Sequence, residues 1–205
     1  MRNKRKYRNQ HILLILNIIL LGVFSHSIRD LPKHYKSLVY VSSFNTIYYL
    51  LCRRHLVWEF IPNGVHWLMI RLVHVFIVTP LITLIFLSKM PSELFRQIIY
   101  LIRWVIIASV IEYLAHKKNL ILYAHGWNIF WSSLLYVKMF VYSYLFNKRP
   151  FVTLFLSLCS TIFFALKFKV PFKMKHYSKY FEPLVDVYYH TFLEDLFSNK
   201  KRKLY

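Results

Sequence analysis

Long apolar stretches of this 205-residue chain contain a few charged residues, Arg103 among them, and three of these have chemistry that suits ion pairing or anion binding. They are Arg71, Glu112 and Lys138. In a bilayer such residues are costly, so they face protein or water instead of lipid. Glu112 is the only acid within these stretches, and we therefore hypothesise an Arg71–Glu112 pair between two helices. The alternative is that each side chain reaches the interface separately. Lys138 lacks an acid partner of this kind and could bind backbone carbonyls, an anionic lipid head group or an anionic solute.

A metal site is the other chemistry that these residues suggest. Glu112 and His116 lie one helical turn apart, and His125 is the nearest third ligand. The chain has no His-Glu-x-x-His motif, no second close pair of carboxylates and no pair of neighbouring cysteines, since Cys52 and Cys159 are far apart. The sequence therefore predicts no metal, no cofactor and no catalytic residue.

Six apolar stretches must position these side chains, and basic clusters and prolines separate them. They run near residues 11–28, 37–52, 67–88, 97–115, 129–147 and 151–167. About 18 apolar residues are enough to span a bilayer as a helix. The second stretch is the weakest, because it is short and contains several polar residues, and Pro80 is expected to kink the third. We predict an all-α fold, a polytopic membrane bundle of about six transmembrane helices.

The charge of the chain supports a membrane over nucleic acid. It has 28 Lys and Arg, 8 Asp and Glu, and a net charge of +20, yet 57% of its residues are hydrophobic. A nucleic-acid-binding protein carries basic residues through its domain as a patch or stripe. Here 14 of the 28 lie in residues 1–10 and 167–205. With both termini in the cytosol, 18 basic residues face the cytosol and 7 the outside, as the positive-inside rule favours.

The two ends of the chain are expected to lie in the cytosol against anionic lipid head groups. Residues 1–10 form a basic N-terminus and residues 168–205 a basic tail. Within the tail, apolar residues recur at three- and four-residue steps over about 183–198, which predicts an amphipathic helix. It would lie on the cytosolic leaflet, or pack on the bundle or on a second copy of the chain. The expected partners are therefore the lipid bilayer and either a homo-oligomer or another membrane protein, with no nucleic acid.

The connection before the fifth stretch has a clear turn signal. Gly126 permits a tight turn, and Asn128 is expected to cap the helix that follows. Trp127 and Trp131 are expected to anchor this turn at the membrane interface. A functional alternative is that Glu112, His116, Asn128 and Lys138 line one polar pocket.

The central part of the chain resembles a known family. The motifs are Glu112, residues 122–128, Trp131-Ser132, Met139-Phe140, Lys148-Arg149-Pro150 and residues 168–171. Over about residues 65–172 they resemble an uncharacterised family of small multi-pass membrane proteins of spore-forming Firmicutes. The Gly-Trp-Asn and Trp-Ser block is its most specific part, whereas Leu145-Phe146-Asn147 replaces a His that members often carry before Arg-Pro. The resemblance implies a bacterial membrane location and no particular activity.

The sequence favours a non-enzymatic integral protein of the cell membrane with a structural or partner-binding role. The alternative is a small carrier or channel for an anionic solute that uses Lys138. Six-span carriers often show an internal duplication, and this chain shows no repeat.

Overall fold

The computed structural model describes residues 16, 20, 22, 25–52, 55–61 and 66–170, and this part of the chain is mostly helical. Four helices in it are long and apolar enough to cross a membrane. They are Trp67–Ser88, Leu94–Lys117, Ile129–Lys148 and Pro150–Lys167. These four correspond to the third to sixth predicted spans. The prediction of six is not confirmed, because most of the first span lies outside the described residues and the second is not among these four helices. The amphipathic helix predicted at 183–198 also lies outside the described residues.

The second predicted span is helix α2 (Leu31–Leu51), which is 21 residues long and begins six residues earlier than expected. Pro32 lies between the first and second predicted stretches and was therefore expected in the connection between them. Proline is tolerated in the first turn of a helix, where its missing N–H has no partner in any case, and Pro32 lies in that turn. Helix α2 is therefore about as long as the four apolar helices. It differs from them in composition, because it carries Lys33, Lys36 and many hydroxyl groups.

Helices α3 (Trp67–Val73) and α4 (Thr79–Ser88) form one continuous rod through a π-helical segment, η2 (His74–Val78). The π turn comes just before Pro80, whose ring would clash with the preceding turn of a regular α-helix. The hydroxyl of Ser42 on α2 donates to the Val75 carbonyl at 3.1 Å. Where the sequence predicts a kink at Pro80, the structure thus has a widened π-helical turn just before the proline. One carbonyl group of this turn accepts a hydrogen bond from the neighbouring helix α2.

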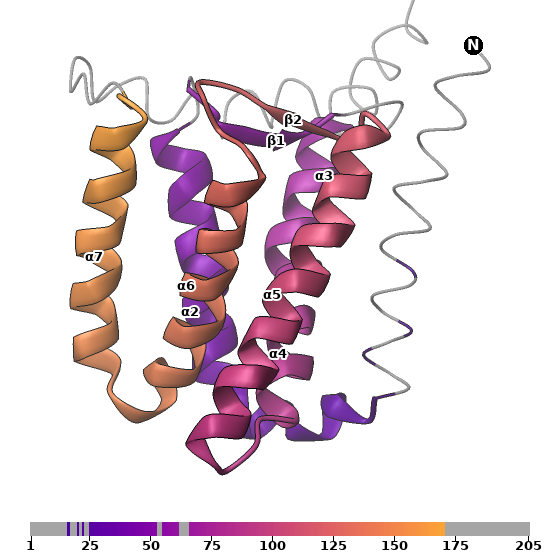
Figure 1. Ribbon diagram of the computed structural model, residues 1–205, viewed down its shortest axis with the longest axis vertical. Coiled ribbons are helices and arrows are strands. Elements are labelled where there is room, and N and C mark those ends of the chain that lie inside the picture. The colour runs from indigo at the N-terminus through magenta and orange to yellow at the C-terminus, as the bar shows by residue number, and fades with distance from the viewer. Residues whose placement is uncertain are drawn as a thin grey trace, which may run out of the picture. The chain divides into compact units, whose positions relative to one another are not determined.

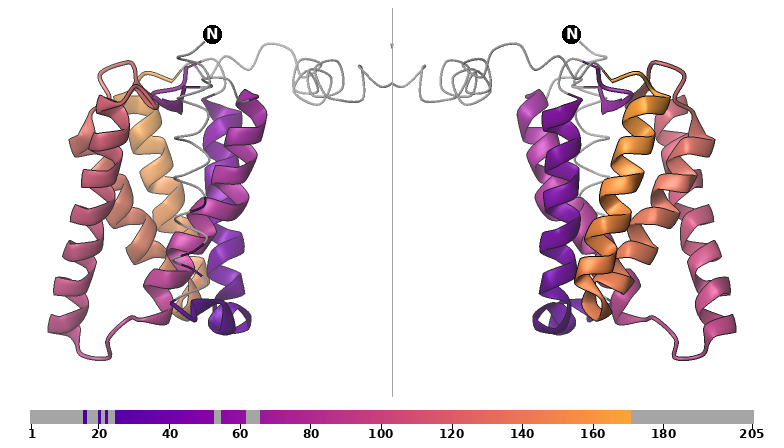
Figure 2. Two further views of the ribbon diagram at one scale, coloured as in Figure 1. Left: turned by 90° about the vertical axis from the view of Figure 1, so that its right-hand side faces the viewer. Right: turned by 90° about the vertical axis from the view of Figure 1, so that its left-hand side faces the viewer.

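The helices run alternately up and down between two ends, as Figures 1 and 2 show. We call the end that carries strands β1 (Trp58–Phe60) and β2 (Ile121–Tyr123) the sheet end. The opposite end holds the short helix η1 (Ser27–Asp30), the α4–α5 connection and the α6–α7 turn. Helix α6 (Ile129–Lys148) is central, since it packs against α2, α4, α5 (Leu94–Lys117) and α7 (Pro150–Lys167).

The fold is mostly helical, as predicted, and two short strands that were not predicted add to it. They pair antiparallel, with Trp58 opposite Tyr123 and Phe60 opposite Ile121. Two further backbone bonds extend the ladder, from Ala124 N to Val57 O and from Ile61 N to Leu120 O, each at 2.9 Å. Strands of three residues are too short for a period-two pattern to be recognised in the sequence. They join two connections that the sequence analysis treated as separate loops.

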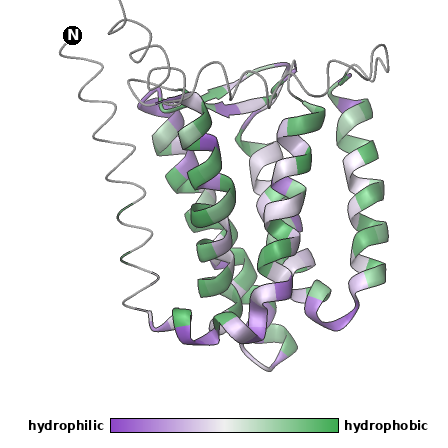
Figure 3. Cartoon of the chain, turned by 180° about the vertical axis from the view of Figure 1, so that it is seen from behind, coloured by the Kyte–Doolittle hydropathy of each residue, from purple (hydrophilic) through white to green (hydrophobic). Residues whose placement is uncertain are grey.

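Hydrophobic residues run along the helices (Figure 3), and many of the large ones are exposed. The buried residues of α5 are Glu112 and Ala115, while Leu94 and Phe95 near its start are 73% and 72% exposed. On α7, Phe151 is 85% exposed and Leu166 is 71% exposed. Water-soluble monomers rarely expose contiguous apolar surface on this scale. Together with the lengths of the four helices, this surface indicates a membrane protein.

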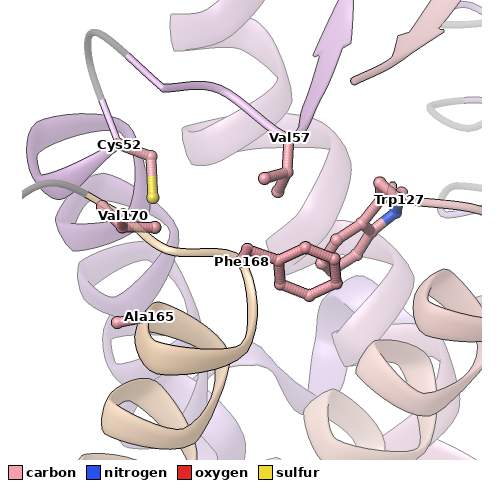
Figure 4. Close-up of a cluster of buried hydrophobic side chains, with 6 residues drawn as sticks. All are labelled: Cys52, Val57, Trp127, Ala165, Phe168 and Val170. Carbon is pink, nitrogen blue, oxygen red and sulfur yellow. The ribbon is translucent and has the colours of Figure 1, made fainter. Parts of the chain in front are cut away.

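A compact hydrophobic cluster lies at the sheet end, where α2 and α7 finish (Figure 4). Its buried members are Cys52, Val57, Trp127, Ala165, Phe168 and Val170. The chain leaves α7 through Lys169, which has φ 50°, and the Val170 N–H bonds back to the Ala165 carbonyl at 2.9 Å. Phe168 and Val170 therefore belong to the packed bundle, although the sequence analysis began the cytosolic tail at residue 168.

Candidate functional site

Glu112 is the centre of a buried hydrogen-bond network near the sheet end of α5. Its side chain is buried, with 4% of the residue exposed, about 7.5 Å below the last residue of the helix. Among the described residues, four side chains donate to its carboxylate. Oε1 accepts from Trp58 Nε1 at 2.9 Å, from the Tyr123 hydroxyl at 2.7 Å and from Ser132 Oγ at 2.5 Å. Oε2 accepts from the Tyr136 hydroxyl.

The secondary structure explains why these donors converge. Trp58 and Tyr123 are directly opposite in the antiparallel ladder, so their side chains lie on the same face of the sheet. Ser132 and Tyr136 are four residues apart on α6 and therefore lie on one face of that helix. One carboxylate on α5 thereby links β1, β2 and α6.

The network continues to Trp127. Its Nε1–H donates to Ser132 Oγ at 2.8 Å, and that hydroxyl in turn donates to Glu112. The turn before it is closed by a bond from Trp127 N to Ala124 O at 3.0 Å, and His125 and Gly126 have φ of 55° and 81°. Positive φ at both central positions is typical of a type I′ turn, and it suits glycine. The predicted turn is present, but Trp127 is only 7% exposed and packs in the core instead of anchoring at the interface.

Asn128 occupies the N-cap of α6, as its sequence position predicts. Its Oδ1 accepts from the backbone N–H groups of Phe130 and Trp131 at 3.0 and 3.3 Å. The Trp131 ring is half-buried and packs edge-on against Phe168, with ring centroids 5.4 Å apart. The cap thus fixes where α6 begins, and through it the positions of Ser132 and Tyr136.

We expect Asn128→Ala to lower the free energy of unfolding by about 1 kcal/mol, because two N–H groups lose their acceptor. Asn128→Asp, which keeps the acceptor, should change it far less. The thermal midpoint of the purified protein in detergent measures both changes. Equal losses in the two variants would contradict a capping role.

The donors around Glu112 supply what a buried carboxylate needs. An ionised carboxylate has about four acceptor positions, and burying it without partners is very costly. Burial, reinforced by the hydrogen bond to Glu112, raises the pKa of Tyr123, so its hydroxyl keeps its proton and remains a donor. The carboxylate is therefore engaged by the protein itself, and this arrangement suits a structural role better than proton transfer or metal binding.

The histidines nearest to Glu112 in the sequence are engaged elsewhere. His116 stacks on Tyr123 with ring centroids 4.2 Å apart, and its Nδ1 lies 2.9 Å from the Ile121 carbonyl oxygen. A carbonyl only accepts, so Nδ1 carries the proton. His125 stacks on His55 at 3.5 Å. Within the described part of the chain, no three metal-ligating side chains come together.

Arg71 pairs with Glu59 and not with Glu112, which corrects the hypothesised helix-to-helix ion pair. The guanidinium carbon also lies 4.5 Å from the Trp67 ring centroid and 5.2 Å from that of Tyr49. Glu59 stands between Trp58 and Phe60 on β1, so its side chain points away from the face that Trp58 presents to Glu112. The same strand therefore binds α5 through Trp58 and α3 through Glu59.

Lys138 lies near the middle of α6 and does not join the Glu112 network. Its Nζ is 5.8 Å from the ring centroids of Tyr142 and Phe164, and the described residues provide no ion pair for it. The polar pocket predicted from Glu112, His116, Asn128 and Lys138 is not formed. Lys138 contacts aromatic rings of α6 and α7, whereas Asn128 is committed to its cap.

Comparison with known proteins gives no match: no family model, no curated protein and no solved structure is similar to this chain. Its function must therefore be argued from the geometry. Sequence reasoning assigned no role in this site to five residues, although Tyr123 and Ser132 stand in the motifs of the resemblance and the last two residues are one helical turn apart. The five are Trp58, Glu59, Tyr123, Ser132 and Tyr136.

Proposed function

We propose that this chain is a non-enzymatic, multi-pass protein of the cell membrane with a structural or partner-binding role. The observation that supports this most is the saturation of Glu112 by donors of the chain itself. A catalytic acid or base must reach the proton that it transfers. Glu112 is buried, and four described side chains occupy its two oxygens.

Other reactive groups near the sheet end are engaged in the same way. Ser132 Oγ receives one hydrogen bond and gives another, and His55 Nε2 lies 2.9 Å from the Phe168 carbonyl oxygen. The motifs behind the resemblance described above include Glu112, Trp127 and Ser132, which are bonded in series here. If these motif residues have the same structural role throughout that family, its members need the same hydrogen bonds between them. We extend the proposal to membership of that family and a bacterial membrane location.

The charge distribution supports an orientation with the sheet end in the cytosol. The basic tail follows α7, which ends at the sheet end, and the basic N-terminus lies on the same side of the membrane if residues 11–28 form the predicted first span. Together they hold half of all Lys and Arg residues. The bilayer with its anionic head groups is then the first partner of the cytosolic surface, because such lipids attract Lys and Arg close to a membrane. We propose that both termini are cytosolic.

A complementation experiment tests the structural role of Glu112. Glu112→Gln keeps the shape and one acceptor but removes the charge. If the role is structural, this variant should restore the phenotype of a deletion strain once its folded amount in the membrane matches that of the unaltered protein. Failure to complement at a matched amount of folded protein would assign a chemical role to the carboxylate.

A second candidate, a carrier for an anionic solute, rests on the mid-helix position of Lys138 without an ion pair among the described residues. In vesicles containing the purified protein, we expect no flux of chloride or phosphate above that of protein-free vesicles. Lys138→Met and Lys117→Met are the matched variants, since Lys117 is exposed at the end of α5. A flux that Lys138→Met abolishes and Lys117→Met retains would replace the structural proposal with the carrier.

A further inference from the structure

An open pocket of about 740 Å³ lies at the end of the bundle opposite to the strands. The start of α2, the α4–α5 connection and the last turn of α6 enclose it, so it belongs to the lower end in Figure 1. Its polar wall comes from Lys33, His34, Lys36, Gln97, Asn147 and Lys148. We call it the basic pocket. None of these side chains takes part in the Glu112 network.

The charge of the basic pocket is of one sign. Three lysines contribute to its wall, and no Asp or Glu does. Two acids lie near the pocket without lining it: Glu93 is paired with Arg96 at 2.9 Å on the exposed surface, and Asp30 interacts electrostatically with His34. Lysines three apart on a helix, such as Lys33 and Lys36, lie on neighbouring parts of one face. Like charges held together in this way repel one another unless an anion lies between them.

Hydrogen bonds hold the polar wall in place and leave donors free. Lys148 Nζ donates to the Tyr144 hydroxyl at 2.7 Å, and an ammonium group has two further N–H bonds to offer. Gln97 Nε2 donates to the Pro91 carbonyl at 2.8 Å and to Tyr144 at 3.3 Å. Asn147 Nδ2 lies 3.1 Å from His34 Nδ1, so the neutral ring carries its proton on Nε2. The polar wall thus carries several hydrogen-bond donors, and bonds to neighbouring residues fix the positions of their side chains.

One side of the basic pocket is apolar. Leu87, Met90 and Pro91 line it beside the polar groups. The pocket also lies at the level where α4 and α6 end, which is where lipid head groups meet a transmembrane helix. A phosphate group offers several acceptor oxygens and more than one negative charge, and lysine binds it as a point charge.

We propose that the basic pocket binds a phosphate group, held by Lys33, Lys36 and Lys148. Two sources share this chemistry: the head group of an anionic phospholipid, and a free phosphate or phosphate monoester. This site is independent of the proposed structural role of Glu112.

The test uses the full chain, purified in a neutral detergent without added lipid. Inorganic phosphate is titrated against chloride at matched ionic strength, and binding is followed by the shift of the thermal midpoint. In parallel, the protein is placed in nanodiscs of phosphatidylcholine with or without phosphatidylglycerol, and lipids that remain bound are counted by native mass spectrometry. Saturable binding in the first arm identifies free phosphate, and selective retention of phosphatidylglycerol identifies the lipid.

Three triple variants decide where the binding takes place. Replacing Lys33, Lys36 and Lys148 by Gln should weaken binding tenfold or more, whereas replacing them by Arg should retain it. The control changes Lys117, Lys118 and Lys167 to Gln, which removes the same charge from exposed positions at the sheet end. The thermal midpoint without ligand shows that each variant is folded. The proposal is overturned if neither probe binds more strongly than chloride or phosphatidylcholine, or if the control variant loses as much binding.

Discussion

Replacing Glu112 by alanine is expected to lower the free energy of unfolding by about 3–5 kcal/mol, because it removes the common acceptor of a buried network. The hydroxyls of Tyr123, Ser132 and Tyr136 can rotate toward other acceptors. The Trp58 indole N–H cannot, and a buried donor without a partner costs about 1–3 kcal/mol. Glu112→Gln should cost less than the alanine variant, since the amide oxygen still accepts while its NH2 group meets a donor.

The matched control is Glu93→Gln. Glu93 is 62% exposed in its ion pair with Arg96, and pairs of this kind contribute about 0–1 kcal/mol. Reversible unfolding in mixed micelles measures all three variants. The order of loss should be Glu112→Ala, then Glu112→Gln, then Glu93→Gln. A Glu112→Ala protein that is as stable as Glu93→Gln would show that the network does not hold the bundle.

Trp127→Ala is expected to be nearly as damaging, with a loss of about 3–5 kcal/mol. The indole is buried among the ends of α2 and α7 and the turn before α6, with the Phe168 ring centroid 4.9 Å from its own. Truncation opens a cavity there and leaves the Ser132 hydroxyl without its donor. Trp127→Phe keeps part of the aromatic volume and loses the N–H, so its cost should be smaller, at about 1–2 kcal/mol.

Phe130→Ala controls for the loss of an aromatic side chain near the same turn. Phe130 is 65% exposed, so its removal from the purified protein should change stability by about 0.5 kcal/mol or less. The same unfolding measurement compares the three variants. If Trp127→Phe were as harmful as Trp127→Ala, the aromatic volume that phenylalanine retains would contribute nothing, which would contradict the packing role. A Trp127→Phe protein as stable as the unaltered one would instead show that the hydrogen bond to Ser132 is irrelevant.

Features that depend on neighbouring residues were predictable from the sequence. Four apolar helices follow from continuous apolar stretches, and the turn at Gly126 and the cap at Asn128 follow from the conformations that glycine and asparagine favour. The importance of Glu112 was also predictable, because an acid in an apolar stretch needs partners.

The identity of those partners was not predictable, because it depends on contacts between distant segments. Glu59 lies between the second and third predicted stretches, so it was not considered as the partner of Arg71, although β1 brings the two together. Trp58 is 54 residues from Glu112 along the chain, and only its pairing with Tyr123 directs it there. For Trp127, a position near a span end suggested an interfacial anchor, whereas packing against α7 buries it.

These contacts give the two strands a definite role. They link the ends of the helices at the sheet end, with Trp58 bound to α5 and Glu59 bound to α3. A two-stranded ladder this short is not stable alone in water. We therefore infer that the Glu112 carboxylate, through its hydrogen bonds to Trp58 and Tyr123, attaches the strands to the helix bundle.

Amide hydrogen exchange of Glu112→Gln, compared with that of the unaltered protein, tests this role of the carboxylate. We expect faster exchange at residues 57–61 and 120–124, where the backbone bonds of the ladder lie, and unchanged exchange in the middle of α5. Unchanged exchange in the two strand segments would contradict it.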